Sequence, residues 1–281
     1  DDPAVEVRRM VMACVADGPD PAKNGAAIAA KLVKDPDNEI RAGAARVLAL
    51  GVGKGKPSPG IADAIVGLLD DPDRDVRAIA IRAVGALGAD APKTAAPALA
   101  KLFERGDEGE KLALLRTAKL VGADDLVGLA IADPSPRVRI GAVDAALGAG
   151  LRASSTLSAA LADPDPEVRR AALERLAAQK DKVEAAVLDR ALSLAARDPD
   201  PELSQLALTT IARVAPKDAV VARLHRSLAS RVERERAQAA AAAIGLVDRE
   251  PGAAVQLLEP LLDDASHHVR VAMLPALAAA Y

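Results

Sequence analysis

Aromatic residues are almost absent from this sequence. Among its 281 residues there is no Trp, and Phe103 and Tyr281 are the only Phe and Tyr, although 51% of the residues are apolar. The interior must therefore be built from Ala, Leu, Val and Ile, which suit helices that pack closely through small side chains. The shortage also removes the aromatic rings on which nucleic-acid bases stack.

Cysteine, net charge and long apolar runs are scarce as well. Cys14 is the single cysteine, so no internal disulfide can form, and we expect it on a helix in the core. The 37 basic and 40 acidic residues leave a net charge of -3, which provides no field to hold the chain on nucleic acid or on an anionic membrane. No apolar run approaches the roughly 20 residues needed to span a bilayer. We therefore expect a soluble protein without membrane insertion, with the cytoplasm slightly favoured as its compartment.

Motifs for catalysis or metal binding are also lacking. His225, His267 and His268 are the only histidines, and adjacent residues on a helix point about 100° apart, so His267 and His268 make a poor metal pair. No H-x-x-x-H, C-x-x-C or G-x-S-x-G occurs. We therefore predict that the chain is not an enzyme and holds no catalytic residue, metal or cofactor.

The sequence does contain a short phrase that returns nine times. Its clearest copy runs from Asp71 to Arg77 as DPDRDVR, followed by AIAIRAVGALG. The position of this Arg, here called the reference position, recurs at 8, 41, 77, 111, 139, 169, 204, 236 and 270. The spacings of 28 to 36 residues indicate stacked units of two helices. Lys111 and Ser204 replace the Arg, and the copies at 111 and 236 lack the Asp-Pro pair.

Each copy of the phrase predicts the start of a helix. Asp71 is the expected N-cap and Pro72 the first helical residue, because proline needs no hydrogen-bond partner there. The helices are expected to end in left-handed C-caps near Gly51, Gly88, Gly122 and Gly150. The other helix of each pair, which does not begin with the phrase, is expected near 23–34, 61–70, 93–105, 123–132, 153–162, 181–197, 216–230 and 253–263. The predicted buried stripe of the clearest copy is Val76, Ala80, Ala83, Val84 and Leu87. No strand pattern occurs.

Units of this length that carry D-P-x-x-x-V-R-x-x-A-x-x-A-L resemble HEAT repeats, particularly the short HEAT-like repeats of phycobilin lyases. The resemblance covers nearly the whole chain. It implies an all-α, right-handed α-α superhelix, or solenoid, of about eight to nine repeats, with residues 1–281 as a single array. Because the sequence begins and ends inside a repeat, we expect a fragment of a longer protein, and its Ala, Arg, Asp and Val content suggests a GC-rich bacterial genome.

The resemblance also implies a structural ladder between repeats. In HEAT repeats the phrase opens the second helix of each unit, these helices line the concave side, and the Asp and Arg pair between neighbouring repeats. Carried over to this chain, the ladder comprises Asp35, Arg41, Asp71, Arg77, Asp133, Arg139, Asp163 and Arg169, together with Asp198. We expect a softer stack at the copies around Lys111, Ser204 and Arg236.

A helical wheel of about 100° per residue places a second face opposite the buried stripe. Five residues after the reference position this face carries Arg46, Arg82 and Arg116, and later copies carry acidic residues. Large apolar residues, Leu112, Ile140 and Leu147, fall one or eight residues after it. An apolar group rimmed by charge is typical of a protein-binding groove. Alternatively, curvature covers these side chains, or the Arg residues only keep an Ala-rich helix in solution.

We therefore expect a non-catalytic scaffold that binds a protein partner, or a neighbouring domain of the same chain, along the concave face. One alternative is a regulatory or chromophore-handling module that works with an enzyme, as in the lyases. Another is a nucleic-acid binder, which the acidic balance and the lack of aromatic residues disfavour. Di-iron hydroxylases on HEAT-like scaffolds carry His-Glu pairs, and this sequence has none.

Overall fold

A computed structural model describes residues 2–52, 59–149, 153–178 and 183–281, and these parts of the chain contain helices and no strand. Their contacts divide the chain into two compact units, Asp1–Leu151 and Arg152–Tyr281. The predicted all-α class is confirmed. The organisation of residues 1–281 as one array stays a prediction.

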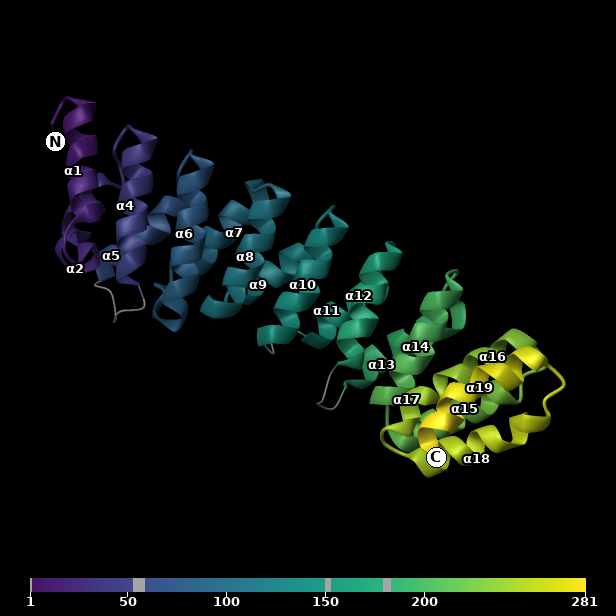
Figure 1. Cartoon of the computed structure of the whole chain (residues 1–281). Helices are drawn as coiled ribbons and strands as arrows, with labels where there is room; N and C mark the ends of the chain where they lie inside the picture. Colours follow the sequence, from purple (N-terminus) through teal and green to yellow (C-terminus); the bar gives the residue numbers. More distant parts are fainter. Residues whose placement is uncertain (1, 53–58, 150–152, 179–182) are drawn as a thin grey trace. The chain divides into compact units, whose positions relative to one another are not determined.

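In the first unit a long helix follows each copy of the phrase. The long helices are α1 (Val5–Asp17), α4 (Asn38–Gly51), α6 (Arg74–Leu87), α8 (Glu108–Val121) and α10 (Pro136–Ala149). Shorter helices precede them: α2 (Pro21–Asn24), α3 (Ala26–Leu32), α5 (Pro59–Gly67), α7 (Ala95–Arg105) and α9 (Asp124–Ala130), with 3₁₀ turns η1 (Leu68–Asp70) and η2 (Gly88–Asp90). Figure 1 shows the long helices side by side in chain order, and α4 packs on α6, α6 on α8 and α8 on α10.

The second unit repeats this arrangement. Its long helices are α12 (Pro166–Ala177), α14 (Pro201–Val214), α16 (Glu233–Ala242) and α19 (His267–Ala280). The others are α11 (Ala153–Ala160), α13 (Ala185–Arg197), α15 (Lys217–Leu228), α17 (Ile244–Val247), α18 (Pro251–Leu258) and the 3₁₀ turn η3 (Glu259–Asp263). Helix α14 packs on α12 and α16, and α16 packs on α19. In both units the structure therefore has the predicted stack of helix pairs.

The helix after the clearest phrase starts two residues later than predicted. Helix α6 begins at Arg74, and its N-cap is Asp73, whose carboxylate accepts from the N–H of Asp75 at 2.8 Å. Asp71, the predicted N-cap, instead accepts from the N–H of Asp73 at 2.8 Å. The prediction was wrong because the first carboxylate closes a turn and the second caps the helix, which leaves Pro72 inside that turn.

The predicted left-handed C-caps are found in part. Gly122 has φ 68° and ψ 33°, the left-handed conformation that favours glycine, and Gly88 also has a positive φ of 54°. Gly51 is the last residue of α4, and its cap is Val52 in an extended conformation, so the C-cap predicted there was wrong. The chain leaves this helix extended and needs no left-handed residue. Gly150 lies outside the described residues.

The core consists of small and branched aliphatic side chains, as the composition predicts. The expected stripe on α6 is buried: Val76, Ala80, Ala83, Val84 and Leu87 are each at most 5% exposed. Cys14 was expected in the core, but it is exposed. That prediction was wrong because α1 buries only Met12, so most of its apolar side chains remain in contact with solvent.

Gly245 provides a test of how closely two helices of the second unit approach. A Cβ at this position would overlap the carbonyl oxygen of Thr209 on α14. We expect Gly245→Ala to lower the free energy of unfolding by about 1–3 kcal/mol, the usual effect of overpacking. Gly252 on α18 has no atom within 4 Å of the added Cβ, so Gly252→Ala should be neutral or stabilise by up to about 1 kcal/mol. Urea denaturation followed by circular dichroism measures both, and equal effects would contradict the close approach.

Candidate functional site

The reference Arg of one repeat pairs with the first carboxylate of the next. Arg41 Nε and Nη2 donate to the two carboxylate oxygens of Asp71 at 2.7 and 2.9 Å. Its Nη1 donates to the carbonyl oxygens of Asp35 and Pro36, in the turn before its own helix, at 2.9 and 3.0 Å. Arg41 and Asp71 are only 8% and 7% exposed. One guanidinium therefore holds its own turn and fixes the next repeat to it.

Equivalent contacts, here called rungs, occur in both units. They join Arg8 to Asp35 at 2.7 Å, Lys111 to Asp133 at 2.7 Å, Arg169 to Asp198 at 2.7 Å and Arg236 to Asp264 at 2.8 Å. Arg139 donates to the carbonyl oxygens of Asp133 and Pro134 at 2.9 and 3.1 Å. Asp163 accepts from the N–H of Asp165 at 2.9 Å, as Asp71 does from Asp73. The structure thus places the ladder residues in or beside the turns between repeats.

Glu110 is a rung residue that the sequence analysis missed. Arg77 has no Asp-Pro pair in the next repeat, and its Nε donates to Glu110 Oε1 at 2.8 Å. Glu110 Oε2 accepts from the N–H of Asp107 at 3.2 Å, while Asp107 caps the N–H of Glu110 at 2.9 Å. This D-x-x-E capping box was the available signal for a carboxylate at the helix start.

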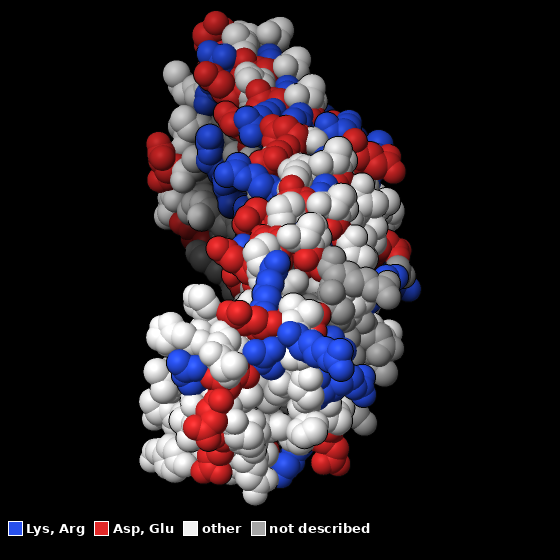
Figure 2. All heavy atoms as spheres, turned by 90° about the vertical axis from the view of Figure 1, so that its right-hand side faces the viewer, with Lys and Arg blue, Asp and Glu red and all other residues white. Residues whose placement is uncertain are grey.

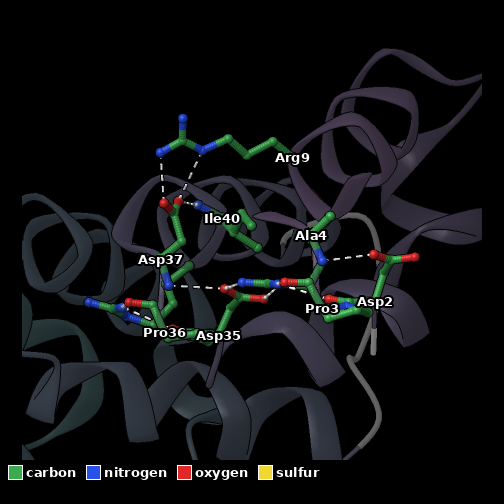
Figure 3. Close-up of polar contacts among 10 residues, drawn as sticks. Asp2, Pro3, Ala4, Arg9, Asp35, Pro36, Asp37 and Ile40 are labelled. Atoms are coloured by element: carbon green, nitrogen blue, oxygen red, sulfur yellow. Dashed lines mark hydrogen bonds and ion pairs between the residues drawn. The ribbon is translucent and has the colours of Figure 1, made fainter. Parts of the chain in front are cut away.

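A second and more exposed line of contacts joins the N-cap residues to the preceding helices. Figure 3 shows this line of contacts at the first joint, where Arg9 Nη2 forms an ion pair with Asp37 Oδ2 at 2.7 Å. The N–H of Asp37 donates to Asp35 Oδ1 at 2.9 Å. Arg74 contacts Asp107 at 2.9 Å in the same way. Exposed pairs of this kind usually contribute at most about 1 kcal/mol. The buried rungs therefore make the larger contribution to the joint.

The two arginines of α4 separate these buried and exposed roles. We expect Arg41→Ala to lower the free energy of unfolding by about 3–5 kcal/mol, because it leaves the buried carboxylate of Asp71 without its cation. Arg46→Ala on the same helix removes an exposed side chain and should change it by less than about 0.5 kcal/mol. Urea denaturation of both variants measures the difference, and similar values would show that the rung does not hold the joint.

Acid should weaken the ladder. The guanidinium of Arg8 lowers the pKa of Asp35, and that of Arg236 lowers the pKa of Asp264, mainly by hydrogen bonding. A carboxylate whose pKa is lower in the folded than in the unfolded state stabilises the folded protein at any pH above its unfolded pKa, which is about 3.9 for Asp. This stabilisation is lost as the pH falls through the folded-state pKa.

We therefore expect the contribution of Asp35 and Asp264 to the free energy of unfolding to be nearly constant between pH 7 and pH 5. At pH values below about 4 this contribution should decrease. Asp35→Asn should reduce this acid dependence, whereas Asp63→Asn, at an exposed residue of α5, should leave it unchanged. Urea denaturation at pH 7, 5 and 3 tests this, and identical pH profiles for the two variants would contradict it.

The three predicted arginines form a row on the first unit. Arg46, Arg82 and Arg116 occupy equivalent positions on α4, α6 and α8, three helices that pack in succession. All three are exposed, and none makes a hydrogen bond or ion pair with a residue that the structure describes. Their guanidinium groups are therefore available to acceptors outside this chain.

The apolar residues predicted beside this row are partly covered. Leu112 and Ile140 are half-buried, and Leu112 packs so closely on α10 that a Cβ at Gly141 would lie 2.9 Å from its Cδ2. The side chain of Leu147 lies outside the described residues. The large apolar side chains that are exposed next to the row are Leu50 and Leu120, at 53% and 56%.

Leu50 and Leu120 were missed by the sequence analysis, which considered only positions one, five and eight residues after the reference position. They lie four residues after Arg46 and Arg116, so they share a helix face with them. This spacing was the signal that could have found them. The row of arginines and these two leucines are here called the Arg-Leu face.

Figure 2 shows Lys and Arg side chains mixed with Asp and Glu on the side that it presents. No group of three or more His, Cys, Asp or Glu residues with metal-binding geometry occurs in the described parts of the chain. Within the same parts, no helix combines the length and apolar character that a membrane span requires.

Comparison with known proteins identifies the repeats. The family model for HEAT repeats matches residues 25–117, about a third of the chain, from α3 into α8. Residues 25–117 carry HEAT repeats. This confirms the resemblance drawn from the D-P-x-x-x-V-R phrase, while the closer likeness to phycobilin lyases stays a prediction. No curated protein matches the sequence.

Three solved structures are similar to this chain at low sequence identity. Importin beta, crystallised in an ammonium sulfate condition, is 12% identical with a TM-score of 0.60, over 98% of this chain and 45% of that chain. An engineered protein is 22% identical with a TM-score of 0.43, over 98% of this chain and 84% of its own. YibA from Escherichia coli is 15% identical with a TM-score of 0.45, over 99% of both chains. The likeness to importin beta supports the HEAT-repeat solenoid fold alone.

Proposed function

We propose that this HEAT-repeat protein is a non-catalytic scaffold that binds a protein partner, or another domain of its own chain, through the Arg-Leu face. The observation that carries the proposal is the row of Arg46, Arg82 and Arg116 on three helices that pack in succession, where all three are exposed and have no partner among the described residues. HEAT-repeat solenoids commonly act as protein-interaction scaffolds, which supports the same reading. That this face is the concave side stays a prediction.

The chemistry of the face favours an acidic partner segment. Arginine forms two parallel hydrogen bonds to a carboxylate, and it is enriched in protein interfaces together with apolar anchors. Leu50 and Leu120 supply exposed apolar area beside Arg46 and Arg116, and the predicted site residues Leu112 and Ile140 are half-buried. An extended segment with acidic residues and occasional apolar ones would pair with both kinds of side chain.

The equivalent face of the second unit is hollowed and mostly apolar. A shallow depression of about 620 Å³ lies between α14 and α16, lined in part by Gln205, Thr209, Ala237 and Ala241. Gln205 and Ala237 lie one residue after the reference position. Thr209 and Ala241 lie five residues after it, where the first unit has Arg46, Arg82 and Arg116. The second unit thus offers an apolar depression at positions equivalent to the basic row of the first unit.

Nucleic acid is the second candidate ligand for the Arg row. Three cations that neutralise three phosphates would give only a modest, strongly salt-dependent affinity. The net charge of -3 and the shortage of aromatic residues disfavour this alternative. A chromophore-handling module would need a pocket with aromatic contacts, and Phe103 is buried at 4% exposure.

A charge-reversal series tests the proposal. We expect the triple change Arg46→Glu, Arg82→Glu and Arg116→Glu to abolish capture of an acidic protein partner, because it places carboxylates where acceptors must bind. The matched control reverses three other exposed cations, Lys23, Lys31 and Lys93, with the same change in net charge. The proteins captured by the immobilised wild type, triple variant and control are identified and compared by mass spectrometry. Each captured candidate is then purified, and its affinity for the three chains is measured.

The outcomes separate the alternatives. A protein bound by wild type and control, and bound at least ten-fold more weakly by the triple variant, supports the scaffold. Salt-sensitive binding of DNA or RNA that only the triple variant loses supports the nucleic-acid alternative. Equal binding by all three chains in both assays contradicts the assignment of the Arg-Leu face.

A further inference from the structure

One joint of the second unit lacks both members of its rung. Ser204 stands at the reference position where other repeats have Arg, and Ser230 stands six residues before Arg236, where others have the rung carboxylate. Ser204 Oγ donates to the carbonyl oxygen of Asp198 at 3.4 Å, in place of the guanidinium that holds this turn elsewhere. Two short side chains therefore replace a long cation and its acceptor.

A pocket lies at this joint. Its volume is about 520 Å³, within the range of small-molecule sites. It is bounded by α14, α15 and α16, which pack on one another within the second unit. Its polar lining is Ser204, Arg223, Arg226, Ser227, Arg234 and Gln238, with Asp198 and Glu235, and its apolar lining is Leu208 and Val232. The Arg-Leu face of the first unit contributes nothing to it.

The three arginines of this pocket have no acceptor in the described parts of the chain. Arg223, Arg226 and Arg234 make no hydrogen bond or ion pair with any described residue. Arg223 Nε is in addition buried without a partner. A buried donor without an acceptor is unfavourable, because it has given up its hydrogen bonds to water. A ligand that accepts a hydrogen bond from this guanidinium would therefore remove the free-energy cost of the unsatisfied donor.

The two carboxylates in the lining do not supply that acceptor. Asp198 is held by Arg169 at 2.7 Å and by the N–H of Asp200 at 2.9 Å. Glu235 accepts from the hydroxyl of Ser230. Both are already engaged outside the group of three arginines. The pocket therefore presents more cation than its own anions neutralise.

We propose that this pocket binds a ligand carboxylate, which takes the place of the missing rung acid. At the rungs described above the acceptor of the cation is a carboxylate, that of Asp35, Asp71, Glu110, Asp133, Asp198 or Asp264. Guanidinium groups match the planar carboxylate with paired hydrogen bonds. Ser227 and Gln238 can donate to a second carboxylate, and Leu208 and Val232 suit a short hydrocarbon linker.

A carboxylate of this kind can come from a free organic diacid or from the side chain of an acidic peptide, and the probes distinguish the two sources. Succinate and glutarate serve as free diacids, a capped tri-glutamate peptide as the acidic segment, and inorganic phosphate as a non-carboxylate anion. Isothermal titration calorimetry with the full chain at fixed ionic strength measures the affinity for each probe.

Two sets of variants test the site. Arg223→Gln with Arg226→Gln should weaken carboxylate binding at least ten-fold, whereas Arg213→Gln, at an exposed arginine of α14 outside the pocket, should leave it unchanged. Ser230→Asp restores the acid that other repeats have at this position. It should therefore raise the melting temperature and weaken ligand binding at least ten-fold, and it remains informative if the arginine variants fail to fold.

Binding of a diacid or of the peptide, lost in Ser230→Asp, supports the proposal and names the source. Absence of binding for every carboxylate probe overturns it. Phosphate binding as tight as that of the diacids, or carboxylate binding that survives Ser230→Asp, also overturns it, because either result describes attraction by charge alone.

Discussion

The buried pair between a reference Arg and the carboxylate of the next repeat is the contact on which the stacking of this chain depends. The core is Ala, Leu, Val and Ile, whose hydrophobic contacts are favourable but not directional. A helix with such a surface could slide along its neighbour at little cost. The Arg41 to Asp71 pair removes that freedom, because it joins two oxygens of one repeat to a guanidinium that already holds its own turn.

The ladder also decides where the surface can bind something else. Along the first unit the rung cations are engaged with carboxylates, whereas the arginines of the Arg-Leu face, five residues further along the helices, are not. In the second unit the joint at Ser204 has no rung, and three arginines lie there without an acceptor among the residues that the structure describes. Both candidate sites follow from the same rule, that a guanidinium without an internal carboxylate is open to an external one.

The sequence alone predicts the fold well and the site partly. The period, the phrase and the buried stripe on α6 lead directly to stacked helix pairs, because a repeated pattern must satisfy the same packing each time. The start of α6 was misplaced because Asp71 and Asp73 are both plausible caps, and only the structure shows which one closes the turn. Glu110 was missed because it lies outside the phrase, although its capping box was readable.

Exposure was the less predictable part. Cys14 and Leu112 are both apolar in character, yet one is exposed and the other half-covered by α10, since burial depends on what each helix packs against. The pocket at Ser204 also escaped the sequence analysis. Its lining comes from three helices that are separate in the sequence, and Ser204 comes together with Arg223 and Arg234 only when α14, α15 and α16 pack on one another.

A double-mutant cycle between Arg41 and Asp71 tests the central claim most directly. The free energy of unfolding is measured for the wild type, Arg41→Gln, Asp71→Asn and the double variant, and the coupling energy is the departure from additivity. A rung that fixes the register predicts a favourable coupling of about 1–3 kcal/mol, in the range found for contacting residues. A coupling below about 0.3 kcal/mol would show that the two residues act independently, and it would contradict the ladder as the interaction that orders the repeats.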